Sequence, residues 1–272
     1  MDTCVFSKHL QAYGFRELGR ALRAIGVAGV DLTVRPKGHV EPEEVADRLP
    51  EAAEGLRAEG VRILMITTAI TSVGDSHARA VLETAAKLGI RFYKCGYYLY
   101  DGFGTVRRAL AEARAKLKDL GAMSKEIGVF GGYHNHAGDY LGACPAHLAD
   151  LVEDADPDGI GLFFDPAHAT AEGACSGWKE GLDYVAPRVR MLALKDFRLV
   201  FSPEETKFQT VPMGEGIVRW SEFFKAVHRI AGQIGPVSIH AEYDVPAGEV
   251  LRLAARDKAF YERTWKESAQ PR

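Results

Sequence analysis

Short apolar runs alternate along this chain with longer segments that have the periodicity of an amphipathic helix. The runs are rich in Val, Ile, Leu and Phe and are short enough for buried strands. A weaker run near the N-terminus extends the same pattern to the start of the chain. The pattern predicts eight strands, at residues 3–6, 30–34, 61–66, 90–93, 128–133, 160–164, 189–194 and 237–239.

The segments between these runs carry apolar residues three and four positions apart, as one buried helix face requires. The clearest stripes are Leu18, Leu22 and Ile25; Ala78, Val81, Leu82, Ala85 and Leu88; and Val106, Leu110, Ala113, Leu117 and Leu120. Glycines that favour a left-handed helix cap stand between a stripe and the next strand, at Gly26, Gly60, Gly89 and Gly128. Eight strand–helix units in 272 residues predict a (β/α)8 TIM barrel.

A doubly wound open sheet is the alternative fold for such an alternation. That fold usually has a glycine-rich turn after its first strand, whereas the turn here is Ser7-Lys8-His9-Leu10. No Pro/Gly/Ser-rich linker divides the chain. We therefore expect one TIM barrel domain over residues 1–272.

Composition narrows the function classes. Hydrophobic residues make up 47% and charged residues 26% of the chain, with a net charge of −3, as in a globular protein without a polyanionic partner. The sequence lacks a bilayer-length apolar run and begins without the pattern of a signal peptide. The cysteines lie far apart and form no CxxC pair, so we expect free thiols and a cytoplasmic protein; they are Cys4, Cys95, Cys144 and Cys175.

Polar side chains gather where the expected strands end. In a TIM barrel the C-terminal strand ends form the active site, so these residues are the candidates for chemistry. They are Arg35 and His39 after 30–34, Tyr97 after 90–93, His134 and His136 at the end of 128–133, Asp165 and His168 after 160–164, Lys195 and Asp196 after 189–194, and His240 and Glu242 after 237–239.

The spacing of these candidates suggests their roles. His134 and His136 alternate on one strand and point to the same side, which favours ligand or catalytic residues over structural ones. Asp165 follows a very apolar run, so its carboxylate must be paired, metal-bound or used to cap the next turn. Lys195 is placed to neutralise an anionic intermediate, or else to pair with Asp196 or another carboxylate. Glu242 is a candidate metal ligand or general base.

Six segments in register resemble the sugar isomerase/epimerase superfamily of xylose isomerase-like barrels, which includes endonuclease IV, inosose dehydratase and tagatose 3-epimerase. They are Gly29-Val30-Asp31-Leu32, Tyr133-His134-Asn135-His136, Phe164-Asp165-Pro166-Ala167-His168-Ala169, Leu194-Lys195-Asp196-Phe197, Pro212-Met213-Gly214-Glu215-Gly216 and Ser238-Ile239-His240-Ala241-Glu242-Tyr243. The resemblance implies the same barrel fold and a sugar-processing activity.

The superfamily commonly binds one divalent metal through a Glu, an Asp, a His and a Glu on its last four strands. Asp165 and Glu242 match this pattern, His134 stands in place of the first Glu, and Ala193 stands in place of the His. One interpretation is that His134, Asp165 and Glu242 hold Mn²⁺, Zn²⁺ or Co²⁺, with His136 or His240 as a further ligand. The other is that the site has lost its metal and uses Lys195 as its cation.

The resemblance implies a sugar or keto-sugar isomerase or epimerase that abstracts a proton next to a carbonyl with metal assistance. A dehydratase or lyase similar to inosose dehydratase and a non-catalytic sugar-binding barrel are the alternatives. An endonuclease would need three metals and a basic DNA-binding face, which the net charge argues against. The expected partner is a small-molecule sugar or sugar phosphate, with a second copy of the chain as a further candidate, and neither nucleic acid nor a membrane. The residues assigned to catalysis are Glu242, Lys195 and His136, and those assigned to substrate binding are Arg35, His39, Tyr97, His168 and Asp196.

Overall fold

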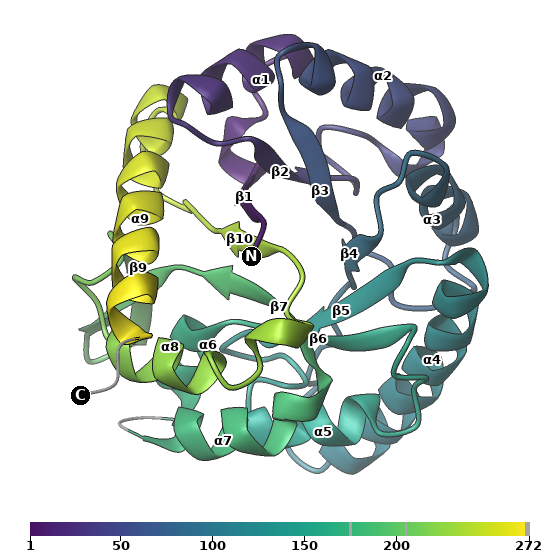
Figure 1. Ribbon diagram of the computed structural model, residues 1–272. Coiled ribbons are helices and arrows are strands. Elements are labelled where there is room, and N and C mark those ends of the chain that lie inside the picture. The colour runs from purple at the N-terminus through teal and green to yellow at the C-terminus, as the bar shows by residue number, and fades with distance from the viewer. Residues whose placement is uncertain (174–175, 205, 270–272) are drawn as a thin grey trace.

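Eight parallel strands form a closed barrel, which confirms the predicted (β/α)8 fold (Figure 1). The computed structural model describes residues 1–173, 176–204 and 206–269, so Cys175 lies outside the described residues. Around the barrel the order is β1-β10-β7-β6-β5-β4-β3-β2. The strands are β1 (Thr3–Phe6), β2 (Gly29–Thr33), β3 (Arg62–Thr67), β4 (Phe92–Lys94), β5 (Phe130–His134), β6 (Ile160–Phe164), β7 (Val189–Leu194) and β10 (Val237–Ile239).

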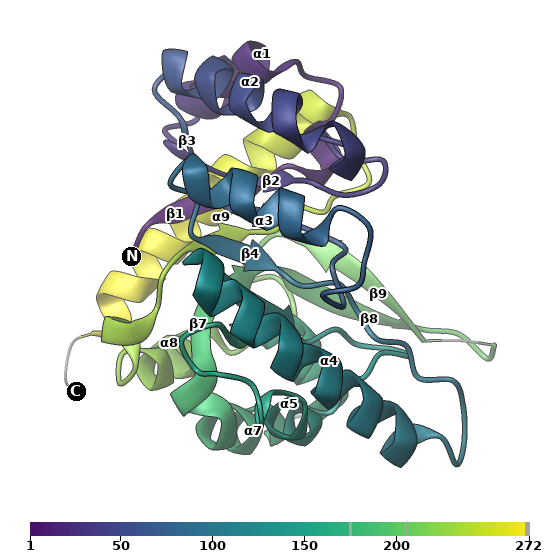
Figure 2. The same ribbon diagram turned by 90° about the vertical axis from the view of Figure 1, so that its right-hand side faces the viewer.

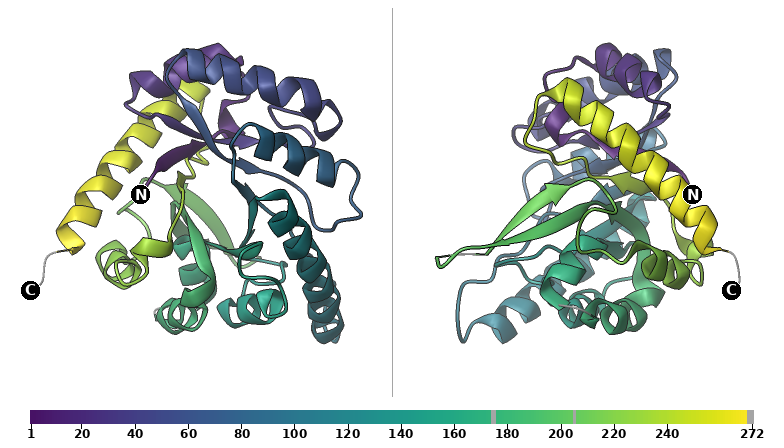
Figure 3. Two further views of the ribbon diagram at one scale, coloured as in Figure 1. Left: turned by 45° about the vertical axis from the view of Figure 1, so that its right-hand side comes forward. Right: turned by 90° about the vertical axis from the view of Figure 1, so that its left-hand side faces the viewer.

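Helices pack around the outside of the barrel (Figures 1 and 3). They are α1 (Phe15–Ala24), α2 (Val45–Ala58), α3 (Ala78–Lys87), α4 (Val106–Ile127), α5 (Pro145–Val152), α6 (Pro166–Gly173), α7 (Gly177–Val185), α8 (Trp220–Val227) and α9 (Ala247–Ser268), with 3-10 turns η1 (Lys8–Leu10), η2 (Pro42–Glu44), η3 (Ala186–Arg188) and η4 (Ala231–Gln233). The predicted glycine caps Gly26, Gly60, Gly89 and Gly128 all have positive φ, from 71° to 85°. No described helix is both long and apolar enough to cross a membrane.

The barrel interior changes from apolar to polar along the strands. A small apolar cluster fills one layer, made of Cys4, Met65, Phe163, Met191 and Ala193. Gly132 lies against this layer, and a Cβ there would lie 1.9 Å from Met191 Cε and 2.9 Å from Phe163 Cβ, so a larger residue would force these side chains to move. Asp165 and Lys195 follow Phe163 and Ala193 by two residues, just past the ends of β6 and β7. Because side chains alternate along a strand, they also face the barrel interior. This apolar layer therefore lies directly beneath the polar residues at the strand ends, and we call it the apolar floor.

A two-stranded antiparallel hairpin interrupts the barrel pattern between β7 and α8. It consists of β8 (Asp196–Phe201) and β9 (Thr206–Val211), and it projects beyond the barrel (Figures 2 and 3). The sequence analysis did not predict it. The returning chain is fixed by the Asp196 carboxylate, which accepts hydrogen bonds from Trp220 Nε1 at 2.8 Å and from the backbone N–H groups of Phe197, Gly214, Gly216 and Val218.

Replacing Asp196 should therefore destabilise the fold. In Asp196→Asn one acceptor oxygen becomes an NH₂ donor that faces other donors, and at least one buried donor loses its partner. We expect a loss of about 1–3 kcal/mol in the free energy of unfolding, measured by urea denaturation. The control is Asp154→Asn, which removes an exposed ion pair with Arg114 and should cost less than about 1 kcal/mol. Equal stability of the two variants would contradict this role of Asp196.

Candidate active site

The Asp165 carboxylate lies at the centre of the polar strand ends and is fully buried. Its Oδ1 accepts the backbone N–H groups of Ala167 (2.8 Å) and His168 (3.1 Å) at the start of α6. Its Oδ2 lies 3.3 Å from His134 Nε2, 3.3 Å from Lys195 Nζ and 3.9 Å from His168 Nε2. One oxygen thus caps the turn, while the other faces the site.

Lys195 carries the central positive charge of this site. It is 2% exposed, and its Nζ bonds Glu242 Oε2 at 2.9 Å as well as approaching Asp165. Glu242 Oε1 in turn accepts a hydrogen bond from Lys8 Nζ at 2.9 Å. Of the pairings considered for Lys195, the structure contains those with Asp165 and Glu242, whereas Asp196 holds the hairpin loop.

The pKa values of Lys195 and Glu242 are set more by the attraction between opposite charges than by burial. Burial lowers the pKa of Lys195, but Glu242 and Asp165 raise that pKa above its ordinary value overall. Burial raises the pKa of Glu242, but Lys195, followed by His240 and Lys8, holds it well below its usual range. Both side chains are therefore ionised at neutral pH.

Three buried histidines surround this charged centre in neutral form. Burial, followed by the nearby Lys195 ammonium, holds the pKa values of His134, His168 and His240 well below 6.5. His134 Nδ1 lies 2.7 Å from the Tyr97 hydroxyl, which fixes the ring from the side opposite Asp165. Neutral imidazole is the form that can bind a metal or accept a proton.

His240 is buried without a hydrogen-bond partner for either ring nitrogen. Its ring stacks on Phe6 with centroids 4.5 Å apart, and its Nε2 lies 3.9 Å from Asp31 Oδ2. Asp31 is held in place by Thr67 Oγ1 at 2.8 Å and Ser238 Oγ at 2.9 Å. Buried nitrogens without partners are costly, so their retention suggests a group that they bind.

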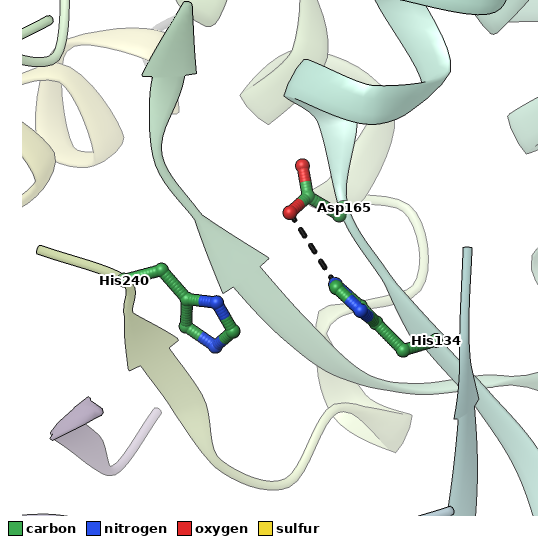
Figure 4. Close-up of side chains that lie close together, drawn as sticks. All are labelled: His134, Asp165 and His240. Atoms are coloured by element: carbon green, nitrogen blue, oxygen red, sulfur yellow. Dashed lines mark hydrogen bonds and ion pairs between the residues drawn. The ribbon is translucent and has the colours of Figure 1, made fainter. Parts of the chain in front are cut away.

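The donor atoms of His134, Asp165 and His240 all lie within 4.8 Å of one another (Figure 4). In the figure, His134 and Asp165 face each other and the His240 ring turns toward them from the end of β10. Two imidazoles and a carboxylate suit Zn²⁺, Mn²⁺ or Co²⁺. Glu242, expected as the third ligand, is not a member of this group, whereas His240, the additional candidate, is.

His136 and His168 lie side by side, and the backbone of Ala137 fixes their tautomers. Their ring centroids are 4.0 Å apart. The backbone N–H of Ala137 donates to His168 Nδ1 at 3.1 Å, and His136 Nδ1 donates to the Ala137 carbonyl at 2.8 Å. In their neutral forms, His168 therefore carries its proton on Nε2, while His136 has a free lone pair on Nε2. One imidazole is a donor and its neighbour an acceptor.

The residues predicted to bind substrate separate into two groups. Tyr97 and His168 contact the central cluster, and Arg35 lies above Phe6, with its Cζ 5.8 Å from the ring centroid. His39 lies within hydrogen-bonding distance of Ser7, Thr33 and the Leu10 carbonyl, so it links the segment after β1 to the segment after β2. His39 and Asp196 therefore both form hydrogen bonds that hold the loops around the site in place.

Sequence analysis assigned no role to two charged residues of the barrel interior. Asp31 lies within β2 and Lys94 at the end of β4, and both are buried. Lys94 Nζ donates to the Cys95 carbonyl at 2.7 Å and lies 3.5 Å from the Tyr97 ring centroid. Burial raises the pKa of Asp31 to about 7 and lowers that of Lys94 to about 7. Inward parity on each strand is the signal that could have identified them.

Comparison with known proteins identifies the kind of barrel. The profile of the family described as xylose isomerase-like TIM barrel matches residues 19–261. No curated protein sequence matches the chain significantly.

Solved structures share the fold at low sequence identity. The IOLI protein with bound zinc is similar at 15% identity and a TM-score of 0.74, with 100% of both chains covered. The D-psicose 3-epimerase from Clostridium cellulolyticum H10, solved with D-tagatose, has 12% identity and a TM-score of 0.72, covering 97% of this chain and 99% of that one. The probable 3-DHS dehydratase AsbF from Bacillus anthracis has 15% identity and a TM-score of 0.69, covering 96% and 98%.

The low pKa values of the buried histidines predict acid sensitivity of the metal-free protein. Below about pH 6.5 the unfolded chain binds protons that the folded His134, His168 and His240 do not, so stability falls as the pH falls. Each such histidine contributes a slope of up to about 1.4 kcal/mol per pH unit. Urea denaturation in EDTA from pH 7 to pH 5 should therefore give a shallower pH dependence for His240→Gln than for wild type. His77→Asn, which changes an exposed residue with positive φ, should leave the slope unchanged; an unchanged slope in His240→Gln would contradict the prediction.

Proposed function

The chain belongs to the family of xylose isomerase-like TIM barrels, and from that premise we propose that it is a sugar or keto-sugar isomerase or epimerase. The observation that carries the proposal is the pair His136 and His168, with complementary tautomers, beside the buried Lys195 ammonium. Proton transfer next to a carbonyl needs a base, a proton donor and a stabilised oxyanion. The structure of a D-psicose 3-epimerase with D-tagatose among the similar folds is consistent with this chemistry.

In this proposal, His136 is the base. Its Nε2 lone pair is free, because Nδ1 is committed to the Ala137 carbonyl. Burial, followed by Lys195, lowers the pKa of His136, which keeps the ring unprotonated at neutral pH. The ring would remove the proton from the carbon next to the substrate carbonyl. His168 would present its Nε2–H to an oxygen of the same substrate.

Lys195 would stabilise the enediolate oxygen that forms when the proton leaves. An ammonium group has three N–H donors, and Asp165 and Glu242 engage two of them. The third can donate to the oxyanion, whose charge develops only during the reaction. We assign to Glu242 the task of holding Lys195 charged and oriented, since each of its oxygens already contacts a lysine.

His134, Asp165 and His240 are the residues that would hold one divalent ion. When bound, the ion would act as a Lewis acid toward the substrate carbonyl. Tyr97 would orient His134 through Nδ1, as outer-sphere partners of metal-binding histidines commonly do. The zinc present in the structure of the IOLI protein is consistent with a metal in a barrel of this fold.

A dehydratase is the second candidate. It would start from the same proton abstraction, but the proton taken up by His136 would then go to a departing hydroxyl group on the next carbon, to which His168 Nε2–H would donate a hydrogen bond. The position of this N–H beside His136 favours it, and the similarity to the probable 3-DHS dehydratase is consistent with it. Product analysis separates the two, because elimination removes water whereas isomerisation and epimerisation conserve mass.

Replacing the proposed base should abolish proton transfer without unfolding the protein. In D₂O, wild-type protein should wash deuterium into a ketose at the carbon next to the carbonyl. His136→Gln should lower that rate by about 10²- to 10⁴-fold, the usual contribution of a general base, and should change Tm little because His136 is only partly buried. Mass spectrometry of the sugar measures the exchange. His147→Gln, on the outer helix α5, should exchange like wild type. Wild-type exchange in His136→Gln would remove His136 as the base, and no exchange with any ketose would favour a non-catalytic barrel.

Metal content should distinguish His240 from Glu242 as the third ligand. Wild-type protein purified without chelator should contain about one divalent ion per chain, and Mn²⁺, Zn²⁺ or Co²⁺ added after EDTA treatment should raise its Tm. His240→Gln should lose the ion, whereas Glu242→Gln should keep it. Elemental analysis together with Tm measures both effects. The reverse order, with the ion lost only in Glu242→Gln, would contradict the assignment.

A further inference from the structure

Arg35 is a partly buried cation at the mouth of the site that forms no ion pair among the described residues, although its charge acts on the buried Asp31. Within the described part of the chain its guanidinium also forms no hydrogen bond, and its Cζ lies 5.8 Å from the centroid of the Phe6 ring. Phe6 in turn stacks on His240, a member of the His134, Asp165 and His240 group. Phe6 therefore contacts both the guanidinium and one residue of the proposed metal site.

The loop that carries Arg35 is held in place from several sides. The backbone N–H of Arg35 donates to the Val40 carbonyl at 3.1 Å. His39 contacts Ser7 Oγ, Thr33 Oγ1 and the Leu10 carbonyl at 3.0–3.3 Å. A Cβ at Gly38 would lie 2.8 Å from the Arg35 carbonyl oxygen, so the loop is closely wound at this point. The backbone of Arg35 is thus well anchored, which lowers the entropic cost of using its side chain to bind a ligand.

The site around Arg35 has more cations than carboxylates. Lys8 and Lys195 share Glu242, and Asp165 pairs with Lys195. Lys94, also buried, donates only to a backbone carbonyl. Asp31 is the remaining carboxylate, and its oxygens accept hydrogen bonds from Thr67 Oγ1 and Ser238 Oγ instead of forming an ion pair with Arg35. A divalent ion on His134, Asp165 and His240 would enlarge the positive excess.

We propose that Arg35 binds an anionic group of the substrate, a phosphate or a carboxylate, whose reacting carbonyl lies at Lys195 and His136. The guanidinium fork matches both oxyanions with two parallel hydrogen bonds. The substrate class is then a ketose phosphate or a keto-sugar acid. This inference rests on the proposed function and narrows it.

Paired neutral and anionic ketoses test the inference. The probes are D-ribulose, D-xylulose and D-fructose, each as the free ketose and as its terminal phosphate ester, together with 5-keto-D-gluconate as the carboxylate. Isothermal titration at about 0.15 M salt, where long-range attraction is screened, compares wild type with Arg35→Gln. The matched control is Arg57→Gln, which changes an exposed arginine on α2 that also forms no ion pair among the described residues.

We expect at least one anionic probe to bind wild type at least tenfold more tightly than the neutral ketoses. Arg35→Gln should abolish that preference, while Arg57→Gln should keep it. The phosphate and carboxylate probes show which oxyanion is recognised. Equal binding of neutral and anionic probes, or a preference that survives in Arg35→Gln, would overturn the inference.

Deuterium exchange on the same samples separates this failure from that of the proposed function. Exchange into neutral ketoses without any preference for anionic ones would overturn only the role of Arg35. Binding that depends on Arg35 without exchange into any probe would support the anion site and count against the isomerase. Absence of both binding and exchange with every probe would overturn both.

Discussion

The buried ammonium of Lys195 between Asp165 and Glu242 is the interaction on which the rest of the site depends. Removing a charge from water is costly, and a 2% exposed lysine is retained as a cation only because two carboxylates approach it at 3.3 and 2.9 Å. These carboxylates come from the ends of β6 and β10, and Lys8 extends the chain of charges to η1. The charge network therefore joins strand ends that lie far apart in the sequence.

The same ammonium sets the state of the surrounding histidines. Burial alone lowers their pKa values, and the positive charge of Lys195 adds to that effect. Neutral rings then need hydrogen bonds to fix their tautomers, which Ala137 provides for His136 and His168, while Asp165 and Tyr97 contact His134. His240 has no such partner. The electrostatics and the hydrogen bonds together leave an acceptor at His136, a donor at His168 and unused nitrogens at His240.

The barrel could be predicted from sequence because strand burial and helix periodicity are local patterns. The strands at 3–6, 160–164, 189–194 and 237–239 match the structure at both ends. The hairpin of β8 and β9 was missed although β8 contains Leu199, Val200 and Phe201, because the (β/α)8 pattern leads one to expect a helix after β7. The strand ends identified most of the side chains that enter the barrel mouth, but they gave no role to Asp31 or Lys94 and did not show what the side chains contact there. Glu242 contacts two lysines and His39 binds neighbouring loops, and neither outcome follows from spacing.

The placement of His240 gives a physical account of the altered ligand pattern. The position at which the superfamily commonly has a metal-binding His is Ala193, which lies in the apolar floor with Cys4 and Met191. Ala193 pairs with Ser238 on the adjacent strand β10, and His240 follows two residues later with the same inward parity. An imidazole absent from β7 is thus available from β10, above the apolar floor. With His134 in place of a Glu, the proposed donor set changes from mainly carboxylate to mainly imidazole. The new set carries less negative charge, which suits a site that also contains Lys195 and Arg35.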